Sequence, residues 1–157
     1  MKTLETEKVM KAFATKVVNR AINNLAKQDH IDTGTLAQNL DYSVVVYPSG
    51  ALELDFTAPF YWKFQEKGVK GSSGQNSPKG NGYNSPFKFT SKNIPESAVL
   101  PWVKRKGIKG RDASGKFISH KTLAYLIGRS IALYGIPATR FFSTAFRYEA
   151  KRLPDDI

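Results

Sequence analysis

Apolar side chains recur at the period of a helix over residues 4–28. Five of them follow one another at intervals of four residues: Val9, Phe13, Val17, Ala21 and Leu25. This spacing places them on one helix face, and charged or amide side chains fill most of the opposite face. We therefore expect a long amphipathic helix that covers a core, with packing on a neighbouring subunit as the alternative.

The pattern changes to an alternation of two after residues 29–36, where Asp32 or Thr33 could cap a short turn and Gly34 gives a permissive backbone. Tyr42–Tyr47 is β-branched and aromatic, which favours a strand. Ala51–Thr57 alternates, and its Leu52, Leu54 and Phe56 share one face. A Pro-Ser-Gly turn joins the two segments, so we predict a β-hairpin with one apolar face.

Aromatic side chains then gather in residues 58–67, which end at Gly68: Phe60, Tyr61, Trp62 and Phe64. We predict a short helix or turn that plugs the sheet. Residues 68–92 are rich in Gly, Ser, Asn and Pro, and predict a long, mobile loop. A short helix is expected in residues 93–106, with Pro101 near its start, followed by a second basic loop in which 116–119 could form a strand.

Two amphipathic segments close the chain. His120–Tyr134 predicts a helix that ends at Gly135 and has one apolar face, made of Leu123, Leu126, Ile127 and Ile131. Pro137 precedes a second helix, Ala138–Leu153, in which four side chains are expected to point inward: Phe141, Phe142, Ala145 and Phe146. Together the elements predict an α+β fold in a single domain, 1–157, with helices on a small antiparallel sheet and a long basic insertion at about 69–119.

Composition and charge narrow the function. The chain has 157 residues and no cysteine. This excludes disulfides and argues against zinc-finger and iron–sulfur sites, which ordinarily use cysteine ligands. Its net charge is +11. Residues 67–129 hold thirteen Lys/Arg and two acids, whereas residues 1–57 hold six and seven. The start of the chain has no signal-peptide pattern, and the longest apolar run, near Tyr42–Tyr47, is too short for a bilayer, so we expect a soluble protein made in a cytoplasm.

The basic stretch is the strongest candidate contact surface, and aromatic residues such as Tyr83, Phe87 and Trp102 are interspersed with it. Its candidate residues are Lys70, Lys79, Lys88, Lys92, Lys104, Arg105, Lys106, Lys109, Arg111 and Lys116. Basic side chains neutralise phosphates, and exposed aromatic rings stack on bases. Three interpretations remain open: a solvated surface, a contact with an acidic protein surface, and a contact with nucleic acid.

Catalytic patterns are weak. Lys79 is followed by Gly and Asn instead of the Ser/Thr of a phosphate-binding loop. Glu149-Ala150-Lys151 matches a nuclease Glu-x-Lys element only superficially, because it falls on a helix. His30 and His120 stand in no metal-ligand spacing. We predict no catalytic, cofactor-binding or metal-binding residue and no enzyme activity, with a small metal-dependent nuclease as a remote alternative.

The order of several short motifs resembles the neck or tail-completion proteins, which join head to tail in long-tailed bacteriophages. In that family a helix precedes a Thr-Gly-x-Leu turn, a strand pair leads to a Tyr-rich segment ending in Glu-x-Gly, and a Pro-Phe segment opens a final helix. The matching positions are Thr33, Gly34, Leu36, Tyr61, Glu66, Gly68, Phe141, Phe142 and Ala145. The match covers residues 4–68 and 120–153, while Pro137 stands four residues before Phe141 and residues 69–119 are longer than usual.

The resemblance implies a structural virion protein that forms a homo-oligomeric ring between the portal complex and the tail. It implies partners among adjacent neck, portal or tail proteins, with possible contact to DNA in the channel, no membrane partner, and a location at the head–tail junction after synthesis in the host bacterium. The basic insertion would then be an assembly arm that becomes ordered on contact. The competing hypothesis is a basic nucleic-acid-binding module of another fold.

Overall fold

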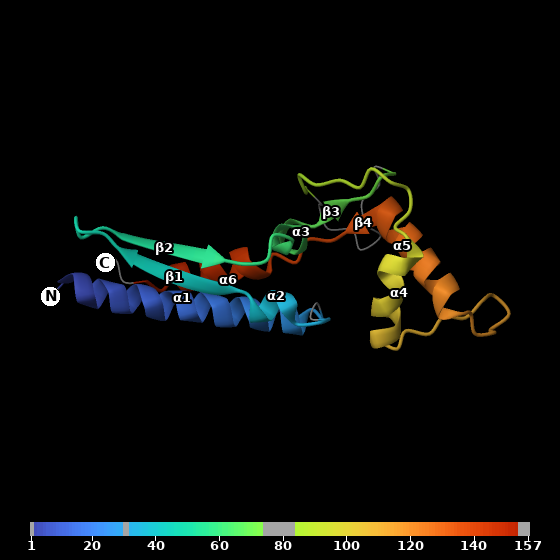
Figure 1. The fold of residues 1–157 in the computed structure, drawn as a ribbon, viewed down its shortest axis with the longest axis horizontal. Helices are drawn as coiled ribbons and strands as arrows, with labels where there is room; N and C mark the ends of the chain where they lie inside the picture. The colour runs from blue at the N-terminus through green and yellow to red at the C-terminus, as the bar shows by residue number, and fades with distance from the viewer. Residues whose placement is uncertain (1, 30–31, 74–83, 154–157) are drawn as a thin grey trace. The chain divides into compact units, whose positions relative to one another are not determined.

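The computed structural model describes residues 2–29, 32–73 and 84–153, and its mixture of helices and strands confirms the α+β class (Figure 1). The chain divides into two compact units. Unit 1 comprises Met1–Glu66 and Thr139–Ile157, and unit 2 comprises Lys67–Ala138. The division does not test whether residues 1–157 fold as one domain, so the single domain stays a prediction. Within the described ranges, no helix is both long and apolar enough to cross a membrane.

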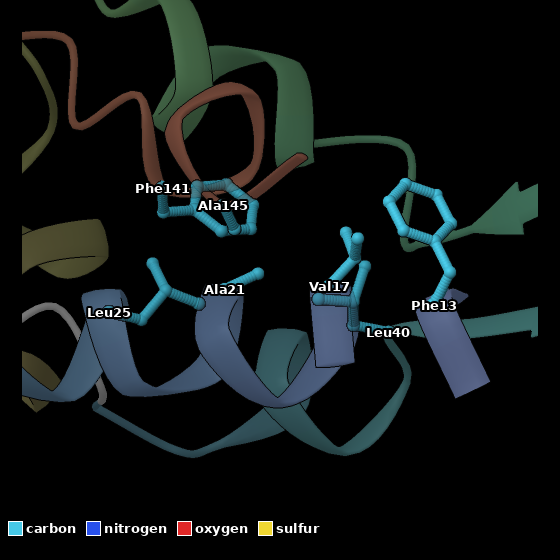
Figure 2. Packing of buried hydrophobic residues seen from close by; sticks show 7 residues of the cluster. All are labelled: Phe13, Val17, Ala21, Leu25, Leu40, Phe141 and Ala145. Carbon is cyan, nitrogen blue, oxygen red and sulfur yellow. The ribbon is translucent and has the colours of Figure 1, made fainter. Parts of the chain in front are cut away.

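Unit 1 is built on α1 (Lys2–Lys27), which matches the predicted amphipathic helix. Its predicted stripe is confirmed: Phe13, Val17, Ala21 and Leu25 are buried, and Val9 is half-buried. The helix α6 (Phe141–Ala150) packs along α1. Figure 2 shows Phe141 and Ala145 of α6 facing this stripe, with Leu40 beside it.

The predicted hairpin is also confirmed. β1 (Asp41–Val46) pairs antiparallel with β2 (Leu52–Thr57), so that Val44 lies opposite Leu54. The three predicted side chains of β2 are half-buried, and the residues between them are exposed. The ring of Phe56 meets the ring of Phe142 edge-on, with 5.0 Å between centroids. The apolar face of the hairpin therefore covers the core that α1 and α6 form.

The start of α6 differs from the prediction, because the helix begins at Phe141 instead of Ala138. Arg140 has a φ of 50°, in the left-handed region, which breaks the helical backbone just before this point. Backbone N–H groups of Thr139 and Arg140 donate instead to the carbonyls of Gln65 and Glu66. The inward face is also only partly as predicted, since Phe146 is 39% exposed.

The aromatic segment forms the short helix α3 (Trp62–Lys67), as predicted. Trp62 packs against the core of unit 1, but Phe60 is 76% exposed, so the idea that the whole aromatic group plugs the sheet is wrong for Phe60. Phe60 precedes the helix, and its ring meets the neighbouring ring of Tyr61. The one-turn helix α2 (Thr35–Gln38) precedes β1.

Unit 2 contains more regular structure than the predicted loops. A short pair, β3 (Val69–Lys70) and β4 (Gly135–Ile136), is antiparallel, and α4 (Glu96–Arg105) packs on α5 (His120–Tyr134). Its core cluster is small, with Val99, Val103 and Ala124 buried, and Val69 and Ala132 are buried outside this cluster. Residues 74–83 of the predicted loop lie outside the described residues. Residues 116–119 form only an isolated bridge from Phe117 to Arg111, so the predicted strand there is wrong.

Pro101 lies in the interior of α4, although we expected it near the helix start. A proline at this position costs the helix one backbone hydrogen bond, which would run to the residue four places earlier. The side chain is exposed, and the helix ends four residues later. Its neighbours Val99 and Val103 are buried, so burial of the apolar face compensates for the missing bond.

The bounds of α5 match the prediction, and its predicted apolar face is confirmed in part, because Leu123, Ile127 and Ile131 are half-buried. The buried side of the helix is lined by small residues, Ala124, Gly128 and Ala132, while Leu126 is 48% exposed. A Cβ placed on Gly128 would lie 2.6 Å from the carbonyl oxygen of Ile94. Close backbone approach therefore decides the orientation of α5, and the larger side chains Leu123 and Ile127 flank the contact.

Candidate functional site

Eight of the nine family-motif positions lie in unit 1, and Gly68 lies at the start of unit 2. Thr33, Gly34, Leu36 and Tyr61, which come from two separate segments, line one hollow of about 120 Å³. Gly34 has a φ of 81°, so the turn favours glycine at this position. The Oε1 atom of Gln65, whose side chain also lines the hollow, is buried without a hydrogen-bond partner in the described part of the chain.

Glu66 connects this region to α6. Its side chain is 6% exposed, and its two carboxylate oxygens accept the backbone N–H groups of Phe142 (2.9 Å) and Ser143 (3.2 Å). These N–H groups belong to the first turn of α6, where a helix has no internal acceptors. A carboxylate is favoured there by the positive end of the helix dipole. Because Arg140 at the N-cap makes no side-chain cap, Glu66 caps α6 from α3.

The remaining motif positions also have structural roles. Phe141 and Ala145 are completely buried in the core of unit 1, and Phe142 packs against that core. Gly68 has a φ of 69°, and its carbonyl accepts a hydrogen bond from the buried hydroxyl of Ser85. Motif residues that are distant in sequence thus share one hollow or one helix cap.

The basic candidates are distributed over unit 2 instead of forming one site. Lys70 lies in β3 and bridges to Lys88 through the backbone, and Lys92 lies in a bend. Lys104, Arg105 and Lys106 lie at the end of α4. Lys109, Arg111 and Lys116 belong to the loop before α5. Lys79 lies outside the described residues. All the described candidates are exposed except Lys70 and Lys106, which are half-buried.

The loop of residues 109–118, here called the basic hairpin, brings Arg111 and Phe117 together. Their backbones form a bridge, and the guanidinium carbon of Arg111 lies 3.9 Å from the ring centroid of Phe117. Arg111 also donates to the carbonyl of Gly115 at 2.7 Å. The ring of Phe117 remains 56% exposed. The hairpin thus presents a cation and an aromatic ring side by side on the surface of unit 2.

The tip of the basic hairpin is held by Asp112. One carboxylate oxygen accepts the Ser114 hydroxyl (2.6 Å), the Ser114 N–H (2.9 Å) and the Lys116 N–H (2.9 Å). Hydrogen bonds from Ser114 first, then from the Lys116 backbone, lower the pKa of Asp112 below its ordinary value. Gly115 has a φ of 84°, as the turn requires. The tip therefore has its own local hydrogen-bond framework.

Glu149, the acid of the Glu-x-Lys pattern, is paired with an arginine. Its carboxylate is 5% exposed, and Oε1 lies 2.6 Å from Nε of Arg20. In the ranges that the structure describes, no group of three or more His, Asp or Glu side chains stands close enough to hold a metal ion. His120 begins α5 and is exposed, and His30 lies outside the described residues.

A second charged region was not predicted from the sequence. The polar face of α1 and the end of α6 enclose a shallow hollow of about 400 Å³ in unit 1. Lys16, Arg20 and Lys27 come from α1, and Arg152 follows α6. The signal was present in the sequence, because positions 16, 20 and 27 share a helix face. It was hidden because a charge count along the chain cancels these cations against acids located elsewhere.

Comparison with known proteins adds no relative: no protein-family model, no curated protein and no solved structure matches this chain. The resemblance to phage neck proteins consequently depends on the order of the short motifs and on what the motif residues do in the fold.

Proposed function

We propose that this protein is a structural component of a tailed-bacteriophage virion and forms a homo-oligomeric ring at the head–tail junction, between portal complex and tail. One observation carries the proposal. Eight of the nine motif positions lie in unit 1, where Gly34 and Tyr61 line one hollow and Glu66 caps the helix that begins at Phe141. Motifs that share an order with a family and are also brought together in the fold support a common architecture better than the motifs alone.

Unit 1 offers surfaces suited to a ring. In the described residues, β1 and β2 pair only with each other, so each strand has one open edge. The open edge of β1 in one copy can pair with the open edge of β2 in the next copy. Such head-to-tail contacts can close into a ring. The hairpin also has exposed apolar side chains at the end of β1: Val45, Val46 and Tyr47 are each more than 40% exposed. Their burial in a neighbour would favour assembly.

Unit 2 would then be the assembly arm. Its thirteen Lys/Arg against two acids suit acidic surfaces of neighbouring neck, portal or tail proteins, or DNA in the channel. The basic hairpin presents Arg111, Lys116 and Phe117 for such contacts.

Native mass spectrometry and electron microscopy of the purified protein, and microscopy of the parent particle, test the proposal. We expect closed rings that dissociate in a Val45→Lys/Val46→Lys variant. Leu4→Lys, at another exposed apolar position on α1, is the matched control and should leave the rings intact. A protein that stays monomeric at all accessible concentrations, together with a parent particle whose junction lacks it, overturns the proposal.

The second candidate is a nucleic-acid-binding module, and the pairing of Arg111 with the exposed ring of Phe117 favours it. This function predicts binding by the monomer, with an affinity that falls steeply as salt rises. Removal of Phe117 by substitution with Ala would then weaken single-strand binding, because a stacking surface is lost. Under the ring proposal, the same substitution affects assembly with partner proteins instead.

A further inference from the structure

The hollow between α1 and the end of α6, here called the cationic groove, is a candidate binding site within unit 1. Four of its lining side chains are cations, and two others are unpaired amides: Lys16, Arg20, Lys27, Arg152, Asn19 and Asn23. Unit 1 as a whole has eleven Lys/Arg and eleven Asp/Glu, so its net charge is zero. The groove is therefore a local concentration of positive charge in a neutral unit.

Among the residues that the structure describes, one acid of unit 1 lines the groove and the others do not. Glu5 and Glu7 are in the first turns of α1, and Glu53 and Asp55 are on exposed positions of β2. Glu149 supplies the carboxylate that lines the groove, and this carboxylate is already paired with Arg20. The charge of the described lining is thus positive even after this ion pair is counted. Such a site attracts an anion and increases its rate of association.

Part of the groove is fixed in place. Arg20 is held by Glu149 and lies over the ring of Tyr148, with 3.8 Å between its guanidinium carbon and the ring centroid. The guanidinium of Arg152 lies over the same ring at 4.1 Å. These contacts limit the freedom of both arginines before any ligand arrives, which lowers the entropic cost of binding.

The other polar side chains of the groove are available to a ligand. Lys16, Asn19, Asn23 and Lys27 are exposed, and in the described part of the chain their side chains have no hydrogen bond or ion pair. Asn24 differs, because its amide donates to the carbonyl of Phe141. The groove therefore offers two ammonium and two amide groups, beside two positioned guanidinium groups.

The lining indicates the class of ligand. It contains no apolar side chain, whereas the centre of a protein–protein interface is depleted in charge and rich in aromatic and aliphatic anchors. Lys16 and Lys27 are separated by about 16 Å along the helix axis, at 1.5 Å per residue. A single small anion cannot span this distance. A polymer that carries a phosphate about every 3.4 Å along each strand can contact the whole row.

We propose that the cationic groove binds the phosphodiester backbone of nucleic acid, without preference for base sequence. The guanidinium groups of Arg20 and Arg152 already lie over the ring of Tyr148, and the available lining groups are ammonium and amide groups, so the contacts are made to phosphates. This site belongs to unit 1 alone. It depends neither on ring formation nor on the basic hairpin of unit 2.

Fluorescence anisotropy of the full-length protein with a labelled short DNA duplex of random sequence, measured over a salt series, tests this proposal. Lys16→Gln/Lys27→Gln removes two groove cations, and Lys8→Gln/Lys63→Gln is a control with the same charge change outside the groove. We expect the groove variant to bind roughly tenfold more weakly near 0.1 M salt, with a slope of log K against log salt that is smaller by about two. The control should retain the slope of the wild type.

A second arm uses competitors. Inorganic phosphate should not displace the duplex, and polyglutamate should compete less well than DNA at equal charge concentration. Equal binding and equal salt slopes for the two variants overturn the groove as the site. Efficient displacement by polyglutamate overturns nucleic acid as its ligand and identifies an acidic protein surface instead. Thermal unfolding of each variant, followed by circular dichroism, must coincide with the wild type for the comparison to stand, and Lys27→Gln alone replaces the double variant if it does not.

Discussion

Unit 1 and unit 2 differ in how they are held together and in charge. Unit 1 has a continuous core in which α1, α6 and the hairpin bury large side chains such as Phe13, Leu25 and Phe141. Unit 2 has three buried apolar residues in its core cluster, yet it carries the entire net charge of +11. The stretch with the strongest charge signal is therefore the one whose fold depends least on side-chain burial.

Backbone proximity takes the place of a large core in unit 2. A Cβ on Gly71 would lie 1.9 Å from the carbonyl oxygen of Leu133, so the chain there touches the end of α5 directly. Ser72 donates its backbone N–H to the carbonyl of Ala132. Gly128 makes the corresponding close approach in the middle of α5. We therefore expect the two units to respond to different kinds of substitution.

The largest effect should come from the core of unit 1. Phe141→Ala removes a fully buried ring and should lower the free energy of unfolding by about 3–5 kcal/mol. Hydrogen exchange should show lost protection in α1 and α6. Phe146→Ala, at a ring that is 39% exposed, is the control and should cost much less. Equal loss of protection in α4 and α5 would show that the two units unfold as one.

Removal of the cap from α6 should have the next largest effect. Glu66→Ala leaves two N–H groups without their acceptor and should cost about 3 kcal/mol, whereas Glu66→Gln keeps one acceptor oxygen and should cost about 1 kcal/mol. Denaturant unfolding measures both values. If Gln and Ala prove equally destabilising, the negative charge of Glu66, and not the hydrogen bonds, supports the helix.

In unit 2, a substitution that ordinarily stabilises a helix should have the opposite effect. Ala in place of a helical Gly usually gains up to about 1 kcal/mol. At Gly128 the added Cβ meets the Ile94 carbonyl oxygen at 2.6 Å, so Gly128→Ala should instead cost about 2 kcal/mol. Ser130→Ala, on an exposed position of α5, is the control and should be neutral or slightly stabilising. A stabilised Gly128→Ala protein would contradict the close contact.

The smallest effect concerns the tip of the basic hairpin. Because hydrogen bonds lower the pKa of Asp112, its carboxylate stabilises the tip above the ordinary Asp pKa, and this contribution is lost as the pH falls through the lowered value. NMR titration of the carboxyl group should show the depressed pKa, with the Ser114 and Lys116 amides shifting in parallel. Ser114→Ala should return the pKa toward normal. A pKa for Asp112 that Ser114→Ala leaves unchanged would assign the shift to another cause.

The sequence predicted unit 1 well because its elements follow regular periods. The interval of four from Val9 to Leu25 and the alternation at Leu52, Leu54 and Phe56 each correspond to a face that the structure buries at least partly. Local patterns could not reveal that Leu126 is exposed, because the small residues of α5 approach a distant backbone. Nor could they locate the helix start at Phe141, which depends on the backbone of Arg140.

The candidate sites were less accessible to sequence reasoning. The motif order identified Glu66 as significant, but its role as the cap of α6 needs two segments to meet, and no local period encodes that meeting. The cationic groove illustrates the same limit for charge. Arg20 and Arg152 are far apart in the chain, and only the packing of α6 on α1 places both guanidinium groups at Tyr148.

The two backbone hydrogen bonds that join Gln65 to Thr139 and Glu66 to Arg140 have an entropic consequence. They fasten the points where the chain leaves unit 1 and returns to it, so the whole of residues 67–138 is an excursion from one anchored site. Lengthening or exchanging such an excursion changes the closure entropy only slowly with length. The length and composition of residues 67–138 can therefore change at little entropic cost while the anchoring contacts in unit 1 stay the same.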